Sequence, residues 1–419
     1  MKRKLINIRF VYILIFLIYI LFEEQEMVGS MMYHVESANN STPFRNYALF
    51  TFTTFVCICL MKRPWPRVSF SVFLLFMYSY VAINSIVHGF AQRATFLQYI
   101  GLTCSTILPL LTYGFSYHLA NILTWKSIER LLALGLLVLA VFYVMNIRMI
   151  TRNDLIDENM QEGSVYIFLM FLPFVMLFSN KKAQFVGVFL IFAAIVLSLK
   201  RGGIITCVLS IVAYYMVSFH VQGKRITGKA KFIFAVTIMA IIVGGLLFMN
   251  NIRGGLIYER FASIESDGGS GRNMIYAITL KMIQDSNERD LLFGHGWNFV
   301  CQDAPFRMSA HNDYLEAMYD MGFVGFLFLL FLLYNVLLQM GGVIKAKSIY
   351  APAYAASFVI FLVNTQISHV FLYPMYMSVL TMFWGYVAGK ENNRNSDKNR
   401  YFTKIKKSIN HRMNHRSYY

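Results

Sequence analysis

Residues 183–221 read AQFVGVFLIFAAIVLSLKRGGIITCVLSIVAYYMVSFHV, an apolar stretch interrupted once, by Lys-Arg-Gly-Gly at 200–203. A helix needs about 20 apolar residues to cross the hydrocarbon core of a membrane, because its backbone must satisfy its own hydrogen bonds there. The stretch is too long for one such helix, and its break is too short for a loop. It therefore predicts two consecutive membrane spans that turn at the membrane boundary, with Arg201 at the turn.

The rest of the chain has the same character. Of its 419 residues, 57% are hydrophobic and 14% are charged, and the mean hydropathy of +0.52 is unlike that of a soluble protein. We therefore expect an all-α polytopic membrane protein with about twelve transmembrane helices. The expected spans are residues 8–22, 47–60, 68–87, 96–119, 131–147, 164–178, 183–199, 204–221, 232–249, 321–340, 351–371 and 373–387.

These spans divide the chain into four regions. Residues 1–249 hold about nine transmembrane helices, residues 250–320 form one large external loop, residues 321–388 hold about three more helices, and residues 389–419 form a basic, disordered tail. A long connection between membrane spans is more often functional than idle, so the loop is the expected place for a site.

The net charge of +17 does not indicate nucleic-acid binding, because the lysines and arginines lie between the hydrophobic runs. Most of them fall on one side of the expected membrane, and most carboxylates fall on the other. The positive-inside rule then places both termini in the cytoplasm and the 250–320 loop outside. We expect the basic tail to contact anionic phospholipid and residues 1–22 to be retained as an anchor.

The sequence predicts neither a metal site nor a disulfide. Four of the five cysteines lie inside apolar runs, and Cys301 stands alone in a polar loop. There is no CxxC or HExxH pattern, so we expect no metal and no cofactor.

Two arginines are candidates for binding an anion. Arg201 is either a cation that snorkels from a helix end or a phosphate ligand, since its guanidinium binds phosphate oxygens bidentately and Gly202 and Gly203 permit close approach. Arg272 follows Gly-Gly-Ser-Gly at 268–271 and begins a segment with the apolar spacing of an amphipathic helix, residues 272–284. This helix either lies flat on the membrane or packs on the bundle as a lid.

A candidate base follows in the segment Ser-Ala-His-Asn-Asp-Tyr-Leu-Glu at 309–316. Ser309 is a plausible N-cap, which would place His311 in the first turn of a helix. The helix dipole would oppose protonation there, leaving a neutral imidazole able to accept a proton from a sugar hydroxyl. A histidine at a helix start can also serve only in packing or capping.

Upstream, Gly294-His295-Gly296-Trp297 predicts a tight turn that presents an aromatic side chain to the apolar face of a sugar. His295 is a weaker rival of His311 for the role of base.

These elements, in this order, resemble the O-antigen ligase and O-antigen polymerase family of bacterial membrane glycosyltransferases. The family's Ser-x-x-Arg-Gly element matches residues 198–202, and its Gly-x-Gly matches residues 294–296. Its His-Asn-x-Tyr-Leu element matches residues 311–315, followed by Gly322 and Gly325. The resemblance covers roughly residues 185 to 335.

The resemblance implies a C-type glycosyltransferase fold in the bacterial inner membrane and a polyprenyl-diphosphate-linked glycan as donor, with no metal or nucleotide sugar. Arg201 and Arg272 would hold the diphosphate, and His311 would activate the acceptor hydroxyl, with inversion at the anomeric carbon. The residues that would bind or position the glycan are Gly294, Gly296, Trp297, Asn312 and Tyr314. The chain departs from the family pattern at Lys200, usually a small residue, and at Tyr276, where Trp is expected.

Several functions stay open at this point. A polymerase of O-antigen, capsule or exopolysaccharide repeat units, with a chain-length regulator as possible partner, is preferred. A ligase that moves the finished glycan to lipid A core or protein shares the same motifs. A flippase for lipid-linked glycans is disfavoured because few ionisable residues lie deep in a span. A purely structural subunit is also disfavoured, because it would give Arg201 and His311 no role.

Overall fold

The computed structural model describes residues 65–66, 68–89, 96–120, 124–152, 165–198, 200–221, 243–244, 247, 250–251, 255–262, 271–305 and 309–394. The expected spans at 8–22 and 47–60, most of the span at 232–249, residues 268–270 and the tail from 395 onward lie outside these residues.

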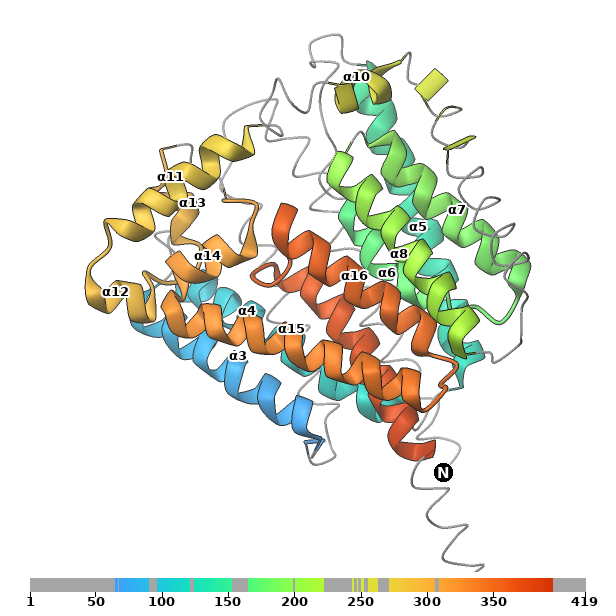
Figure 1. Cartoon of the computed structure of the whole chain (residues 1–419), viewed down its shortest axis with the longest axis horizontal. Helices are drawn as coiled ribbons and strands as arrows, with labels where there is room; N and C mark the ends of the chain where they lie inside the picture. The colour runs from blue at the N-terminus through green and yellow to red at the C-terminus, as the bar shows by residue number, and fades with distance from the viewer. Residues whose placement is uncertain are drawn as a thin grey trace, which may run out of the picture.

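The described residues form helices and contain no strand (Figure 1). This confirms the all-helical class. The helices are α3 (Ser69–His88), α4 (Phe96–Leu119), α5 (Trp125–Arg152), α6 (Tyr166–Val175), α7 (Lys181–Leu197), α8 (Arg201–Val221), α10 (Leu256–Ala262), α11 (Arg272–Gln284), α12 (Glu288–Phe293), α13 (Phe299–Asp303), α14 (Asp313–Asp320), α15 (Gly322–Lys345), α16 (Ala351–Ile367) and a last helix at 374–394.

Three helices in this described part, α3, α8 and α15, are long and apolar enough to cross a membrane, and α6 and α16 are shorter apolar helices. Large side chains point outward from the bundle, among them Phe76 on α3, Phe185 on α7 and Phe331 on α15, which are 65%, 60% and 53% exposed. Many large apolar side chains on the outer surface of a bundle suit lipid rather than water. The number of twelve spans remains a prediction.

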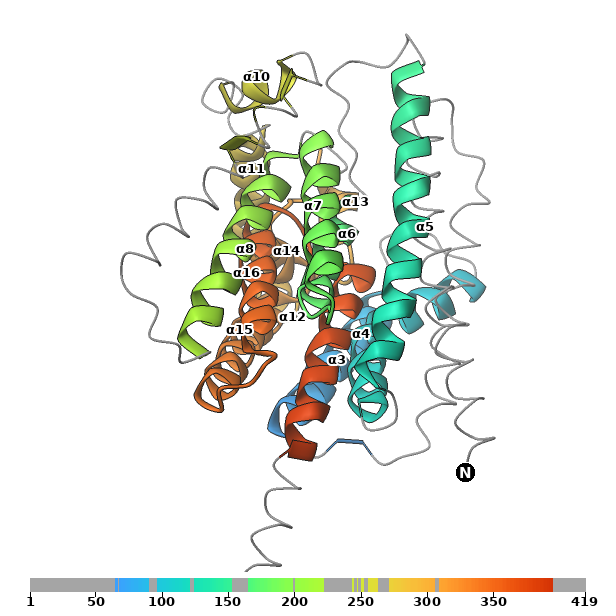
Figure 2. The same ribbon diagram turned by 90° about the vertical axis from the view of Figure 1, so that its right-hand side faces the viewer.

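The core of the bundle is built around α6, α8, α16 and the 374–394 helix. All ten residues of α6 are buried, as expected for a segment that is apolar on every side. Helices α8 and α16 run side by side (Figures 1 and 2). A Cβ on Gly202 would lie 2.6 Å from Cδ1 of Ile367, so this glycine allows the start of α8 to approach the end of α16.

The short break after α7 is present where the sequence predicts it. Helix α7 ends at Leu197 and α8 begins at Arg201. The expected span at 351–371, by contrast, is too long: α16 ends at Ile367, and residues 368–373 form a non-helical connection. This connection becomes important for the site.

Helices α11 to α14 gather at one end of the bundle, beside the ends of α3 and α15 (Figure 1). Helix α11 has the predicted bounds, and it packs Ile275 and Ile283 against Val300 and Tyr319 of the neighbouring short helices. This packing favours the lid over a helix lying flat on the membrane. The Tyr80 hydroxyl of α3 donates to the Met321 carbonyl at 2.7 Å and ties this group of helices to the bundle.

Two glycines allow the turn that follows α12 to lie against the start of α15. Gly294 has φ +82°, and a Cβ there would lie 2.2 Å from the Asp320 carbonyl oxygen. Gly322 has φ +66°, and its Cβ would lie 2.5 Å from the Gly294 nitrogen. Both positions favour glycine by conformation and by space.

We expect Gly294→Ala to lower the free energy of unfolding by at least about 2 kcal/mol, because it adds a backbone clash to a left-handed conformation. Thermal unfolding of the purified protein in detergent measures this. Gly341→Ala is the matched control: Gly341 lies inside α15 with no atom within 4 Å of an added Cβ, so stability should stay constant or rise by up to about 1 kcal/mol. Equal melting temperatures for Gly294→Ala and wild type would contradict this account.

Candidate functional site

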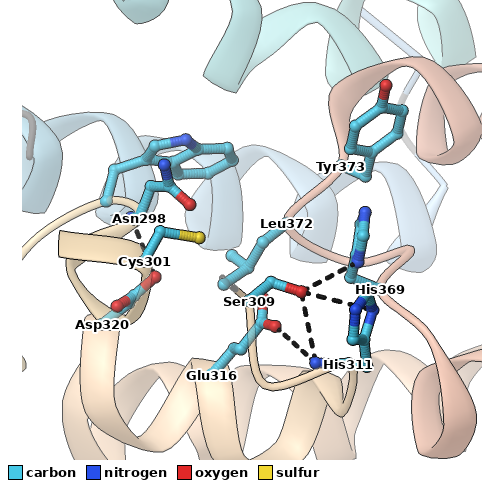
Figure 3. A pocket seen from close by; sticks show the side chains of 10 residues that line it. Asn298, Cys301, Ser309, His311, Glu316, Asp320, His369, Leu372 and Tyr373 are labelled. Carbon is cyan, nitrogen blue, oxygen red and sulfur yellow. Dashed lines mark hydrogen bonds between the residues drawn. The ribbon is translucent and has the colours of Figure 1, made fainter. Parts of the chain in front are cut away.

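A cavity of about 370 Å³ lies where α13, α14 and the 368–373 connection meet (Figure 3). Its polar wall contains imidazole, hydroxyl and carboxyl groups, and its apolar wall contains indole, leucine and phenol side chains. The lining residues are Trp297, Asn298, Cys301, Ser309, His311, Glu316, Asp320, His369, Leu372 and Tyr373.

The start of α14 differs from the sequence prediction. Asn312, not Ser309, is the N-cap: its side-chain oxygen accepts the backbone N–H groups of Tyr314 and Leu315 at 3.0 and 3.2 Å. His311 therefore precedes the helix and has φ +52°, in the left-handed region that histidine enters more readily than most residues. The prediction that His311 occupies the first helical turn is wrong, because Asn312 is the N-cap and the helix begins only at Asp313.

The backbone N–H of His311 is held by two side chains. It donates to Glu316 Oε1 at 3.1 Å and lies 3.2 Å from Ser309 Oγ. The His311 ring has its own contact with Ser309, with Nδ1 3.5 Å from Oγ. These contacts fix the imidazole at the cavity wall although its backbone lies outside the helix.

The His311 imidazole is neutral, for a reason other than the helix dipole. Burial lowers its pKa to about 4, and the positive charges of Arg272 and Lys200 add to this effect. A neutral imidazole with a lone pair is the form that accepts a proton.

Three carboxyl groups lie near His311, and two of them hold neighbouring backbone segments in place. Asp313 accepts the backbone N–H groups of Val370 and Phe371 at 2.8 and 2.9 Å, so it clamps the 368–373 connection onto α14. Asp320 accepts the N–H groups of Asn298 and Val300 at 2.8 and 2.9 Å and thereby positions α13. Burial raises the pKa values of both groups.

Glu316 is the third carboxyl group, and it lines the cavity. Burial raises its pKa to about 7, partly offset by hydrogen bonds from Ser309 and from the backbone of His311 and Ala310. It therefore titrates near neutral pH, unlike an exposed glutamate.

The predicted cations gather around the same end of the bundle. Arg272, the first residue of α11, is half-buried, and its charge acts on His311 and on Tyr276. Lys200, which the sequence marked only as a departure from the family pattern, acts on His311 and His369. Arg201 follows directly as the buried first residue of α8. The structure thus brings Lys200 and Arg272 to the histidines and leaves Arg201 beside Lys200.

The remaining candidates fall into two groups. Trp297 lines the cavity, and it is buried against Val81 and Met321 rather than presented at the surface. Gly294 and Gly296 serve the packing of the turn, since the Gly296 N–H donates to the Asp320 carbonyl at 2.8 Å. Neither Asn312 nor Tyr314 lines the cavity.

Asn312 has a second role besides the cap. Its Nδ2 donates to the Gln366 carbonyl at 3.2 Å, and the Tyr276 hydroxyl lies 3.1 Å from the same oxygen. Tyr276, where a tryptophan was expected, thus helps to tie α11 to the end of α16. His295 lies outside the cavity lining, stacked on Tyr319 with ring centroids 4.1 Å apart.

His369 is the cavity residue that sequence reasoning missed. The predicted span at 351–371 would place it inside a membrane helix, whereas its ring stacks on His311 with centroids 5.5 Å apart and its Nδ1 lies 3.2 Å from Ser309 Oγ. His369 reaches the cavity because α16 ends at Ile367, before the predicted end of the span, and no local pattern in the sequence predicts that end.

Residues 186–330 match the family model described as O-antigen ligase. No curated protein matches the chain. The matched range contains the Arg201 helix start, the Arg272 helix and the His311 segment, while His369 lies beyond it.

Proposed function

We propose that this chain, which residues 186–330 assign to the O-antigen ligase and polymerase family of glycan-transferring membrane enzymes, is a repeat-unit polymerase for a cell-surface polysaccharide. The donor is a polyprenyl-diphosphate-linked glycan, the acceptor is a second glycan, and the reaction takes place on the outer face of the bacterial inner membrane. The observation that carries the proposal is a neutral histidine, His311, in a cavity whose near cations are Lys200 and Arg272.

The groups support an inverting displacement at the anomeric carbon. His311 takes the proton of the acceptor hydroxyl as its oxygen bonds to that carbon, and the bond from the carbon to the diphosphate oxygen breaks. Arg272 and Arg201 stabilise the negative charge on the leaving diphosphate, with Lys200 adding to the local positive potential. Cationic side chains then supply the stabilisation for which other glycosyltransferases use a metal ion.

The cavity suits one part of this reaction. At about 370 Å³ it lies at the small end of ligand pockets, so it accommodates the terminal sugars of an acceptor rather than a long glycan. Trp297 and Tyr373 provide aromatic surfaces in its wall.

Deletion of the gene distinguishes the polymerase function from the ligase function by the glycan that remains. Loss of a polymerase leaves the acceptor lipid carrying one repeat unit, whereas loss of a ligase leaves it bare while lipid-linked polymer accumulates. We expect the single-unit product, with long chains restored by the wild-type gene and not by His311→Ala at equal protein level. A bare acceptor with accumulated polymer would identify a ligase instead, and unchanged glycan would contradict both.

A further inference from the structure

The Ser309 hydroxyl lies beside the two stacked cavity histidines and faces both of them (Figure 3). Its oxygen is 3.2 Å from His369 Nδ1 and 3.5 Å from His311 Nδ1. It also lies 3.2 Å from the backbone nitrogen of His311, which donates to it. One hydroxyl is thus shared among three nitrogen atoms.

A hydroxyl has one hydrogen to donate and two lone pairs to accept with. The His311 backbone N–H occupies one lone pair. If the hydroxyl hydrogen goes to one Nδ1, the other Nδ1 must carry a hydrogen and donate it. If Ser309 donates to His369, then His311 carries its hydrogen on Nδ1 and its Nε2 has the lone pair. If Ser309 donates to His311, the His311 Nε2 carries the hydrogen and cannot act as a base.

We propose that His369, acting through the Ser309 hydroxyl, is a positioning residue that holds His311 in the Nδ1–H tautomer and so leaves the His311 Nε2 lone pair for the acceptor hydroxyl. The proposal rests on the proposed function of His311 as a base. Of the two ring nitrogen atoms, His369 Nδ1 lies closer to Ser309 Oγ, at 3.2 Å against 3.5 Å for His311 Nδ1.

His369 is held in place independently of any substrate. The N–H groups of the next two residues, Val370 and Phe371, donate to the buried Asp313 carboxylate. The His369 ring packs between His311 and Tyr373, at centroid distances of 5.5 and 5.2 Å. Burial, with smaller effects from His311 and Lys200, lowers the pKa of His369 to about 3, so its Nδ1 can remain an acceptor.

Glu316 is the competing acceptor for the Ser309 hydrogen, because its carboxylate also hydrogen-bonds with the Ser309 side chain. If Glu316 took that hydrogen, His369 would have no part in orienting Ser309. Substitutions at His369 distinguish the two cases.

The kinetic test compares two amides of different reach. The Asn amide oxygen occupies the place of histidine Nδ1, whereas the Gln amide occupies that of Nε2. We expect His369→Asn to keep kcat within a few-fold of wild type, and His369→Gln and Ser309→Ala to lower kcat by roughly 10- to 100-fold with little change in KM. A His369→Gln enzyme with the wild-type kcat would overturn the proposal in favour of Glu316.

A second measurement does not depend on turnover. Nitrogen NMR of protein labelled with ¹⁵N-histidine reports which ring nitrogen carries the hydrogen, and a His311→Asn sample assigns the His311 signals. We expect His311 to be Nδ1–H in the wild type and in His369→Asn, and Nε2–H in His369→Gln. An Nε2–H signal for His311 in the wild type would overturn the inference. A His311→Ala enzyme with full activity would refute the proposed function alone, since the tautomer would still be measured.

Discussion

His311→Ala lowers the rate of glycan transfer roughly 100- to 10,000-fold, the range expected when a positioned acid or base is removed. Donor binding is expected to persist, because the cations proposed to bind the diphosphate, Arg201 and Arg272, lie on α8 and α11. Transfer by purified enzyme from a defined lipid-linked donor gives the rate, and donor binding by the same samples shows that the fold is intact.

His295→Ala is the matched control for this prediction. His295 lies near the same group of short helices, stacked on Tyr319 outside the cavity lining, so its loss should change the rate by less than about tenfold. If His311→Ala turned over at the wild-type rate, Glu316 would become the candidate base, since it lines the cavity and its pKa is raised to about 7. Asp313 would not, because its carboxylate already accepts two backbone N–H groups.

The lowered pKa of His311 also fixes the sign of the pH dependence. Only the neutral imidazole accepts a proton, so activity should fall as the pH drops through the pKa of His311, near 4 rather than near 6.5. Glu316 accepts the backbone N–H of His311, and its pKa is about 7. A change in rate near pH 7 that comes from Glu316 should therefore disappear in Glu316→Gln, while the fall in activity near pH 4 remains.

The second large effect is expected at Arg272. Arg272→Ala should lower transfer roughly 100- to 1,000-fold, comparable to the loss of one preorganised group that stabilises developing negative charge. Arg272→Lys should recover only part of the rate, because an ammonium keeps the charge but loses the planar, bidentate fork. Arg201→Ala should act in the same direction.

The control is Arg289→Ala, which removes an exposed arginine from α12, another of the short helices α11 to α14, and should leave the rate unchanged. Arg272→Ala has a further measurable consequence. Its charge lowers the pKa of His311, so removing it should move the acid limb of the pH profile upward. Full activity in Arg272→Ala, with protein level unchanged, would refute a role in binding the diphosphate.

Within the described residues, the sequence predicts several helices well because hydropathy dominates their formation. The bounds of α11 and the break between α7 and α8 agree with the structure, and the apolar runs of α3, α8 and α15 are long enough to span a membrane. Membrane helices have no alternative way of satisfying their backbone, so local composition is sufficient there.

The details of the site were less predictable because they depend on competition between neighbours and on distant contacts. Ser309 and Asn312 are both good caps by type, and only the fold selects Asn312. His369 reaches the cavity because the Asp313 carboxylate holds residues 370 and 371, a contact across more than 50 positions of sequence. Lys200 lowers the pKa of both histidines, although it lies between α7 and α8 and not in the segments that carry them.

The hydrogen bonds of Asp313 join a stretch inside the family match to residues 370 and 371, which lie beyond it. The family match ends at residue 330, yet His369, Leu372 and Tyr373 complete the cavity from beyond it. A substitution at Leu372 or Tyr373 therefore reshapes the cavity while the bonds from His311 to Ser309 and Glu316 stay in place. If the cavity binds a sugar as proposed, changes at Leu372 and Tyr373 would alter its specificity from one side and leave His369 in place.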